Sequence, residues 1–288
     1  MLNRNKYIEK RILYIMNRGN ENNKNNKRNK QDTQNTQDTQ NKKGKELWMD
    51  RGRYLEHWAE QGSEEWKKAR VGRITASVAG TLAGLNVFKS VESVAETILG
   101  KEDVIPESNR EDIERGQKCE APTRKWIEKK YNYEIIERGL CVYKENKIIA
   151  SSVDGDIVGE DCIIEIKHPR KMYRGLSDYM NAVNNGWQAP KDYYEHVLPT
   201  HFAQMQQGCF VLGRKWCLYV VRDIYEGKIF TQRIPFMSQY WDNFYKKILH
   251  NYSIHVEPLL IKNKSEQNEQ NEQENEQKET TKENKNKE

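Results

Sequence analysis

The segment between Asp154 and Lys167 combines acidic and basic side chains at a spacing suited to hydrolysis of a phosphodiester. Asp154 is followed, after a short gap, by Glu165-Ile166-Lys167 at the end of an apolar run. Two carboxylates supply the oxygen ligands that a hard divalent cation prefers. An ammonium group beside them can orient a metal-bound water or help to deprotonate it. These three side chains are therefore the first candidates for a catalytic site.

A β-hairpin would bring the three groups together. Short apolar runs on either side of Gly159-Glu160 predict two strands, and this pair suits a tight turn with glycine first. With these as the two loop residues, Asp154 lies opposite Glu165, and Lys167 shares the same face. A three-residue loop would turn Asp154 to the other face, because a slip of one residue reverses every side chain. The alternative is a surface hairpin that carries ordinary charges.

Residues 109–131 have the periodicity of a helix and place Glu120 within a partly apolar stripe. A carboxylate there is unfavourable unless it is paired or bound to a metal. Gly116, one turn earlier, would allow another element to approach closely. Pro122 predicts a kink or a division of the helix near Glu120. The alternative role for Glu120 is an ion pair with Arg124, one turn later.

A second helix is predicted from Thr200, as its cap, to the residue before Gly213, its C-terminal stop. Gln204 lies on a stripe that borders the apolar one, where a glutamine is usually a boundary residue. Gly208 on the same stripe would leave room for a ligand beside it. The buried stripe is predicted to contain Phe202, Met205, Cys209 and Leu212.

Residues 62–70 predict a helix capped by Ser63, with Trp66 pointing inward. A glycine-broken turn then opens another helix, near whose start Thr75 and Ser77 are by default cap residues. Further along, a hairpin around Glu226-Gly227 and a final helix over residues 241–251 are expected. Strands mixed with helices indicate an α/β or α+β core.

Composition divides the chain of 288 residues into one domain and two tails. Hydrophobic residues make up only 36%, and the deficit is concentrated at the two ends. Residues 1–45 and 262–288 are rich in Asn, Lys, Gln and Glu and cannot bury enough apolar surface to offset chain entropy. Both are therefore predicted to be disordered, which leaves residues 46–261 as one domain.

Charge follows the same division. Residues 1–45 carry 12 Lys and Arg against 4 Asp and Glu, and residues 262–288 carry 6 against 8. The net charge of +5 therefore leaves −1 for the domain between them. The basic tail could attract nucleic acid non-specifically, and the simpler alternative is a solvated tail without a function.

The five cysteines are scattered, with no C-x-x-C pair and no histidine at ligand spacing. This pattern argues against a zinc or iron–sulfur site and predicts reduced thiols in an intracellular, reducing compartment. No apolar run has the length of a membrane span, and the N-terminal segment lacks the features of a signal peptide.

Four separated blocks together resemble the lambda-exonuclease-like, YqaJ-type viral recombinase nucleases of the PD-(D/E)XK superfamily. The resemblance spans about residues 62–221, and each block alone is weak, whereas four in the right order are specific. The proline that usually precedes the core aspartate is replaced by Val153, although the carboxylate itself is kept. The blocks are Trp66-(x)3-Arg70-x-Gly72-x-Ile74-Thr75-Ala76-Ser77, Arg115-Gly116-(x)3-Glu120-x-Pro122, Ser152-x-Asp154-Gly155 with Glu165-x-Lys167-x-Pro169, and Ala203-Gln204-x-Gln206.

The resemblance implies a role for individual residues and a PD-(D/E)XK, restriction-endonuclease-like core with a mixed central sheet flanked by helices. Lys167 and Gln204 would position the attacking water, and Arg70 and Ser77 would contact a 5′ phosphate of DNA. One or two Mg²⁺ ions, for which Mn²⁺ would be a substitute, would be held by Glu120, Asp154, Glu165 and the Ile166 carbonyl.

The resemblance further implies a Mg²⁺-dependent DNA exonuclease that acts on double-stranded ends, 5′ to 3′, in recombination, repair or viral DNA processing. Members of this family can form toroidal trimers and act with a single-strand annealing protein. The same scaffold also occurs in structure-specific or site-specific endonucleases. The non-enzymatic alternative is a DNA-binding scaffold whose tails recruit partners.

Overall fold

The computed structural model describes residues 47–86, 88–101, 107–168, 197–222, 229–263 and 265–266. The chain divides into two compact units, Met1–Lys45 and Glu46–Glu288, and every described residue belongs to the second. The tail predicted over residues 1–45 lies outside the described residues. Most of the tail predicted over 262–288 does so too, and its few described residues are helical.

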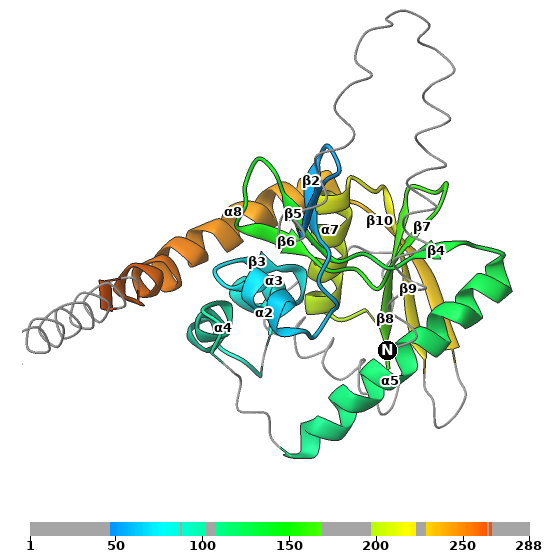
Figure 1. The fold of residues 1–288 in the computed structure, drawn as a ribbon, viewed down its shortest axis with the longest axis horizontal. Helices are drawn as coiled ribbons and strands as arrows, with labels where there is room; N and C mark the ends of the chain where they lie inside the picture. Colours follow the sequence, from blue (N-terminus) through cyan, green and yellow to red (C-terminus); the bar gives the residue numbers. More distant parts are fainter. Residues whose placement is uncertain are drawn as a thin grey trace, which may run out of the picture. The chain divides into compact units, whose positions relative to one another are not determined.

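The described strands form two five-stranded sheets, both of them mixed (Figure 1). In sheet A the order is β1-β2-β5-β6-β3, where β3 and β6 are parallel, and in sheet B it is β10-β9-β8-β7-β4, where β8 and β9 are parallel. Sheet A contains β1 (Trp48–Asp50), β2 (Tyr54–His57), β3 (Ile74–Thr75), β5 (Leu140–Tyr143) and β6 (Ile149–Ser151). Sheet B contains β4 (Ile135–Ile136), β7 (Gly155–Ile157), β8 (Cys162–Lys167), β9 (Trp216–Arg222) and β10 (Ile229–Pro235).

The predicted mixture of strands and helices is confirmed, although the strands are divided between two sheets. The division has a local cause, because β6 ends in sheet A at Ser151 and β7 begins in sheet B at Gly155. Residues 152–154 therefore carry the chain from one sheet to the other. Asp154 lies in this crossing, next to the first residue of β7.

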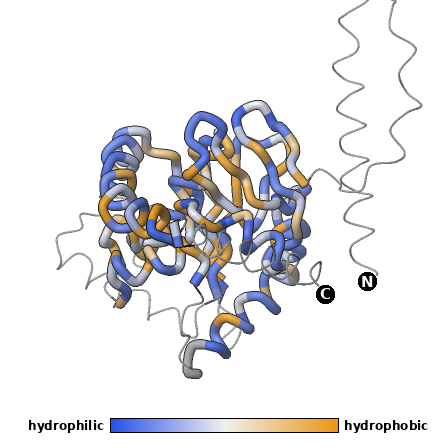
Figure 2. The backbone as a smooth tube through the Cα atoms, turned by 60° about the vertical axis from the view of Figure 1, so that its left-hand side comes forward, coloured by the Kyte–Doolittle hydropathy of each residue, from blue (hydrophilic) through white to orange (hydrophobic). Residues whose placement is uncertain are grey.

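Helix α7 (Pro199–Leu212) contacts both sheets, through β5 and β6 of sheet A and β8 and β9 of sheet B. The largest group of buried apolar side chains surrounds it. On sheet B a smaller apolar group includes Ile127 of α5 (Glu107–Tyr131). The other helices include α2 (Glu64–Arg70), α3 (Ala76–Leu82), α4 (Val91–Ile98) and α8 (Ser238–His255), and residues 257–263 are helical as well. Figure 2 shows hydrophobic residues concentrated along the strands, whereas the helices alternate between hydrophobic and hydrophilic stretches.

Several local predictions are confirmed. Ser63 caps α2 by accepting a hydrogen bond from the Trp66 backbone N–H at 3.2 Å. Gly213 ends α7 with a φ of 68°, in the left-handed region that glycine adopts readily. β9 and β10 form the predicted antiparallel pair, while the turn expected at 226–227 lies outside the described residues. α8 contains the predicted final helix and extends it at both ends.

Thr200 is not the cap of α7, because the helix begins one residue earlier, at Pro199, after Leu198. Proline suits this first position, where its missing N–H would have no helical partner and its fixed φ is already helical. Nor does Pro122 divide α5, which runs unbroken from Glu107 to Tyr131. Pro122 is exposed, so water can reach the helix backbone where the proline interrupts its hydrogen bonding.

The prediction for Gly208 is wrong, and no described element uses the space at Gly116. A Cβ built at Gly116 would have no atom within 4 Å outside its own helix, so none of the described elements approaches there. A Cβ at Gly208 would lie 2.8 Å from Ile163 Cδ1 and 3.2 Å from Val153 Cγ1. The space beside Gly208 is therefore filled by close packing of α7 on the strands, and it leaves no room for a ligand.

Within the described ranges, none of the helices combines the length and the apolar character needed to cross a membrane.

Candidate active site

The predicted hairpin register is confirmed. Gly155 pairs with Ile164 and Asp156 pairs with Ile163, so the same count places Asp154 opposite Glu165. The pairing of β7 with β8 ends there, because the segment that precedes β7 comes from sheet A. Beyond the last backbone pair, the Asp154 side chain bonds β8 instead of the backbone. Its Oδ2 accepts a hydrogen bond from the Ile166 backbone N–H at 2.6 Å.

Lys167 joins the hairpin to α7. Its Nζ donates to Glu165 Oε1 at 2.5 Å and to Gln204 Oε1 at 3.1 Å. Glu165 itself is 2% exposed, although it carries a carboxylate. The structure therefore brings together Asp154, Glu165, Lys167 and Gln204 from β8, the sheet crossing and α7.

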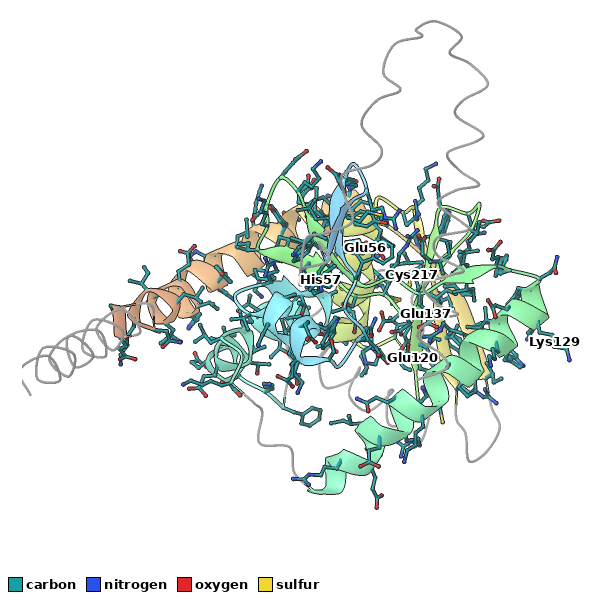
Figure 3. The ribbon with its side chains drawn as sticks, in the orientation of Figure 1. Glu56, His57, Glu120, Lys129, Glu137 and Cys217 are labelled. Atoms are coloured by element: carbon teal, nitrogen blue, oxygen red, sulfur yellow. The ribbon has the colours of Figure 1, made fainter. Side chains whose placement is uncertain are left out.

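Glu120 takes the ion-paired role that its spacing from Arg124 predicted. Arg124, one turn later on α5, forms the expected ion pair with Glu120. The same guanidinium donates to the Asp154 backbone oxygen at 3.2 Å and pairs with Glu137 Oε1 at 2.8 Å. In Figure 3 Glu120 and Glu137 lie together beside the middle of α5, whereas Lys129 points outward near its end. Glu120 is thus ion-paired and also next to Asp154.

The three carboxyl groups repel one another. Burial, reinforced by the Glu165 charge, raises the pKa of Asp154 from 3.8 to about 7. Burial and the Asp154 charge raise the pKa of Glu120 from 4.5 to about 7. The pKa of Glu165 is raised as well, chiefly by burial and also by Glu120. The negative charge of a neighbouring carboxylate therefore helps to raise the pKa of each of the three groups.

Lys167 keeps its charge within this group. Burial lowers its pKa, but the charges of Glu165 and Asp154 outweigh burial, and the net direction is upward. His201, one turn before Gln204 on α7, has a pKa well below its usual value because of burial and the Lys167 charge. Its Nδ1 lies 2.7 Å from the hydroxyl of Tyr219, which pairs with Glu165 in the parallel ladder. No sequence pattern pointed to this contact between His201 and Tyr219.

The chemistry of Glu120, Asp154 and Glu165 fits a divalent cation. They are hard oxygen donors, and their raised pKa values mean that a positive charge among them would be stabilising. In the part of the chain that the structure describes, no three such side chains form a preformed metal cluster. Each carboxylate is instead held by a protein group: Arg124, the Ile166 N–H and Lys167 respectively. A cation would have to take the oxygens that these contacts leave open.

A second cluster surrounds Arg70 at the end of α2. Its Nη2 donates to Thr75 Oγ1 at 3.0 Å and to Ser77 Oγ at 3.1 Å, and its guanidinium lies 4.1 Å above the Trp66 ring. Burial lowers the pKa of Arg70 to about 10. No ion pair joins Arg70 to a carboxylate among the described residues. Thr75 occupies the N-cap position of α3, as predicted, but its side chain makes no cap hydrogen bond. The hydroxyls of Thr75 and Ser77 instead accept from Arg70.

Strand topology places the Arg70 cluster at the same edge as Asp154. Thr75 in β3 pairs with Ala150 in β6, and these two strands are parallel. The chain leaves β3 for Ser77 in the direction in which it leaves β6 for Asp154. Both groups therefore lie beyond the C-terminal ends of neighbouring strands.

Other residues of the four sequence blocks support the fold. Gln206 donates to the Pro235 carbonyl at 2.9 Å and accepts from the Met237 N–H at 2.7 Å, which ties α7 to the start of α8. Arg115 on α5 pairs with Asp112 and donates to the His168 carbonyl at 3.4 Å, directly after Lys167. Pro169 lies outside the described residues.

A buried ion network near Asp154 was not predicted. Asp156, two residues further on, accepts hydrogen bonds from Arg138 and from Arg214, and Arg138 also reaches Glu56 Oε2 at 3.6 Å. Glu56 belongs to sheet A and Asp156 to sheet B. The network therefore links the two sheets beside the crossing that carries Asp154.

Comparisons with known proteins agree with this architecture. A model of the YqaJ-like viral recombinase domain matches residues 65–203. An alkaline exonuclease, LHK-Exo from Laribacter hongkongensis, has a similar structure, with a TM-score of 0.51 and 21% identity over 71% of this chain and 99% of that one. The structure of LHK-Exo in complex with dAMP has a TM-score of 0.50 and 22% identity, over 70% of this chain and 99% of that one. No curated protein has significant sequence similarity to this chain. The fold is thus that of the alkaline exonuclease LHK-Exo.

Proposed function

Residues 65–203 belong to the YqaJ-like viral recombinase domain family, and on this premise we propose that the protein is a Mg²⁺-dependent DNA exonuclease that digests double-stranded ends. The observation that carries the proposal is the convergence of Asp154, Glu165, Lys167 and Gln204 at the sheet crossing. Three interacting carboxylates and a charged ammonium group are more than the stability of a hairpin requires, because buried charges are unfavourable.

Each residue has a task in phosphodiester hydrolysis. Lys167 Nζ carries donors close to the Glu165 carboxylate, where it can orient a water molecule for attack on phosphorus. The Gln204 side chain fixes the position of Lys167 and can also contact that water. The Asp154 carboxylate is aligned by the Ile166 N–H, so it needs little reorganisation when substrate binds.

Asp154, Glu165 and Glu120, with the Ile166 carbonyl, are the groups that would hold Mg²⁺. When bound there, the ion supplies a Lewis acid that lowers the pKa of water and offsets charge on the phosphoryl oxygens. The raised pKa values of Asp154 and Glu120 support this assignment, because both carboxylates would ionise fully beside a cation.

The Arg70 cluster supports digestion from 5′ ends. A guanidinium offers a planar set of donors that suits phosphate oxygens, and in Arg70 it is half-buried without a carboxylate partner among the described residues. Thr75 and Ser77 hold it from one side and place the Ser77 hydroxyl beside it. We assign this cluster to a terminal 5′ phosphate, which would set the direction of digestion as 5′ to 3′. The dAMP bound in LHK-Exo is a nucleotide of DNA, and DNA is likewise the substrate proposed for this chain.

An end-labelled linear duplex beside a closed circular duplex tests the proposal, each with Mg²⁺ and with EDTA. We expect mononucleotides from the linear duplex with Mg²⁺ only, and an intact circle. Cutting of the circle would instead indicate an endonuclease on the same scaffold. Binding of either DNA without any product would indicate a non-catalytic scaffold and would refute the proposal.

A further inference from the structure

The Arg124 side chain on α5 joins three separate parts of the candidate site. Its Nη1 bonds the Glu120 carboxylate and the backbone oxygen of Asp154, and its Nη2 pairs with Glu137, between β4 and β5. The Arg124 side chain is only 11% exposed, whereas its partner Glu137 is 52% exposed. A guanidinium can hold several acceptors in fixed relative positions because its donors lie in one rigid plane, which an ammonium group cannot do.

The contact with Asp154 is made where the strand ladder stops. Gly155 is the first residue of β7 and the outermost one that pairs with β8. The carbonyl of Asp154, one residue earlier, therefore lies beyond the regular pairing of these strands. Arg124 supplies a donor to that carbonyl, and the Ile166 N–H supplies one to the Asp154 carboxylate. Asp154 is therefore held at its backbone by α5 and at its side chain by β8.

We propose that Arg124 is a positioning residue of the nuclease site, which fixes the Glu120 carboxylate relative to Asp154. This inference rests on the proposed function. Glu120 and Asp154 repel each other, and the arginine between them keeps both in place before a divalent cation binds. Because Arg124 is itself a cation, its removal should leave metal affinity equal or tighter, while the two carboxylates lose their alignment.

The test compares Arg124→Met and Arg124→Lys with wild type and with Lys125→Met. Lys125 is the exposed neighbour on α5, so this control removes the same charge without touching the site. Three quantities are measured for each protein: the rate of mononucleotide release from a linear duplex at saturating Mg²⁺, Ca²⁺ affinity by calorimetry, and the melting temperature. For Arg124→Met we expect the rate to fall by about 10-fold to 100-fold with Ca²⁺ affinity not weakened. Arg124→Lys should restore the melting temperature better than the rate, and Lys125→Met should behave as wild type.

Equal rates for wild type and folded Arg124→Met would overturn the inference, as would full recovery of the rate in Arg124→Lys, which would show that charge alone suffices. If Arg124→Met does not fold, Glu137→Ala removes one of the three acceptors at a half-exposed position. It should lower the rate while leaving Ca²⁺ affinity unchanged, and an unchanged rate would overturn the inference. A wild type that releases no nucleotide would instead refute the proposed function, and the inference would fall with it.

Discussion

Replacing Asp154 with asparagine should stabilise the protein in EDTA, and the gain should depend on pH. The pKa of the Asp154 carboxyl rises from 3.8 to about 7 in the folded state, chiefly through burial and the Glu165 charge. A carboxyl with a raised pKa binds its proton more tightly in the folded than in the unfolded chain. Its destabilising effect is therefore absent below pH 3.8, grows as pH rises towards 7, and is complete above 7.

The difference between 3.8 and about 7 corresponds to about 4 kcal/mol of unfolding free energy. This difference already includes the attraction between Asp154 and Lys167, and we expect a net gain of about 2 to 4 kcal/mol at pH 8. In a domain of this size that corresponds to a rise of about 5 to 15 °C in melting temperature. Asparagine can still accept the hydrogen bond from the Ile166 N–H, so the backbone contact is kept.

The assay is denaturant unfolding of wild type and Asp154→Asn in EDTA, at intervals from pH 4.5 to pH 8. The two curves should converge at the acid end and separate progressively above it. Added Mn²⁺ should stabilise wild type more than the variant, because the variant has lost a ligand. Parallel curves over the whole range would refute the account of Asp154 as a carboxylate destabilised by burial and by its neighbours.

Three further predictions concern the site and the tails. Lys167→Ala should abolish cleavage and leave DNA binding in Ca²⁺ largely intact, as a gel-shift titration would show; loss of both together would point to misfolding. Wild type should digest 5′-phosphorylated ends faster than 5′-hydroxyl ends, and Arg70→Ala should largely erase this preference, with Ser77→Ala weaker in the same direction; equal wild-type rates on both ends would remove the 5′-phosphate assignment. A chain of about residues 46–262 should keep its melting temperature and lose DNA affinity at low salt, because the basic segment 1–45 carries the excess charge; a large drop in melting temperature would show that this segment packs on the domain.

The sequence predicted contacts that follow from short-range rules. A glycine-first turn and alternation along two strands sufficed to place Asp154 opposite Glu165. A glycine after an apolar periodic run sufficed to end α7 at Gly213. The pairing of Glu120 with Arg124 followed from their spacing on one helix. Each of these depends on residues that are close in the chain.

Contacts between distant segments were not predictable in the same way. That Arg124 also bonds the Asp154 backbone depends on how α5 lies against the sheet crossing, which no local pattern encodes. What occupies the space beside Gly208 and Gly116 was not predictable for the same reason. A missing side chain leaves room for close packing, a ligand or solvent alike. Gly208 faces strands, whereas no described residue outside its own helix lies close to Gly116. Only the three-dimensional arrangement separates these outcomes.

The most direct test of the central claim is nucleotide release from a 5′-phosphorylated linear duplex by wild type and by Glu165→Gln, at equal folded concentration and saturating Mg²⁺. Glu165 is the most buried of the three carboxylates, and it accepts a hydrogen bond from Lys167. Glutamine has the same shape as glutamate and lacks its charge, so the substitution tests the charge alone. We predict rapid release by wild type, none in EDTA, and a loss of at least about 100-fold in Glu165→Gln. Near-wild-type release by Glu165→Gln would contradict a metal-dependent nuclease site at the sheet crossing.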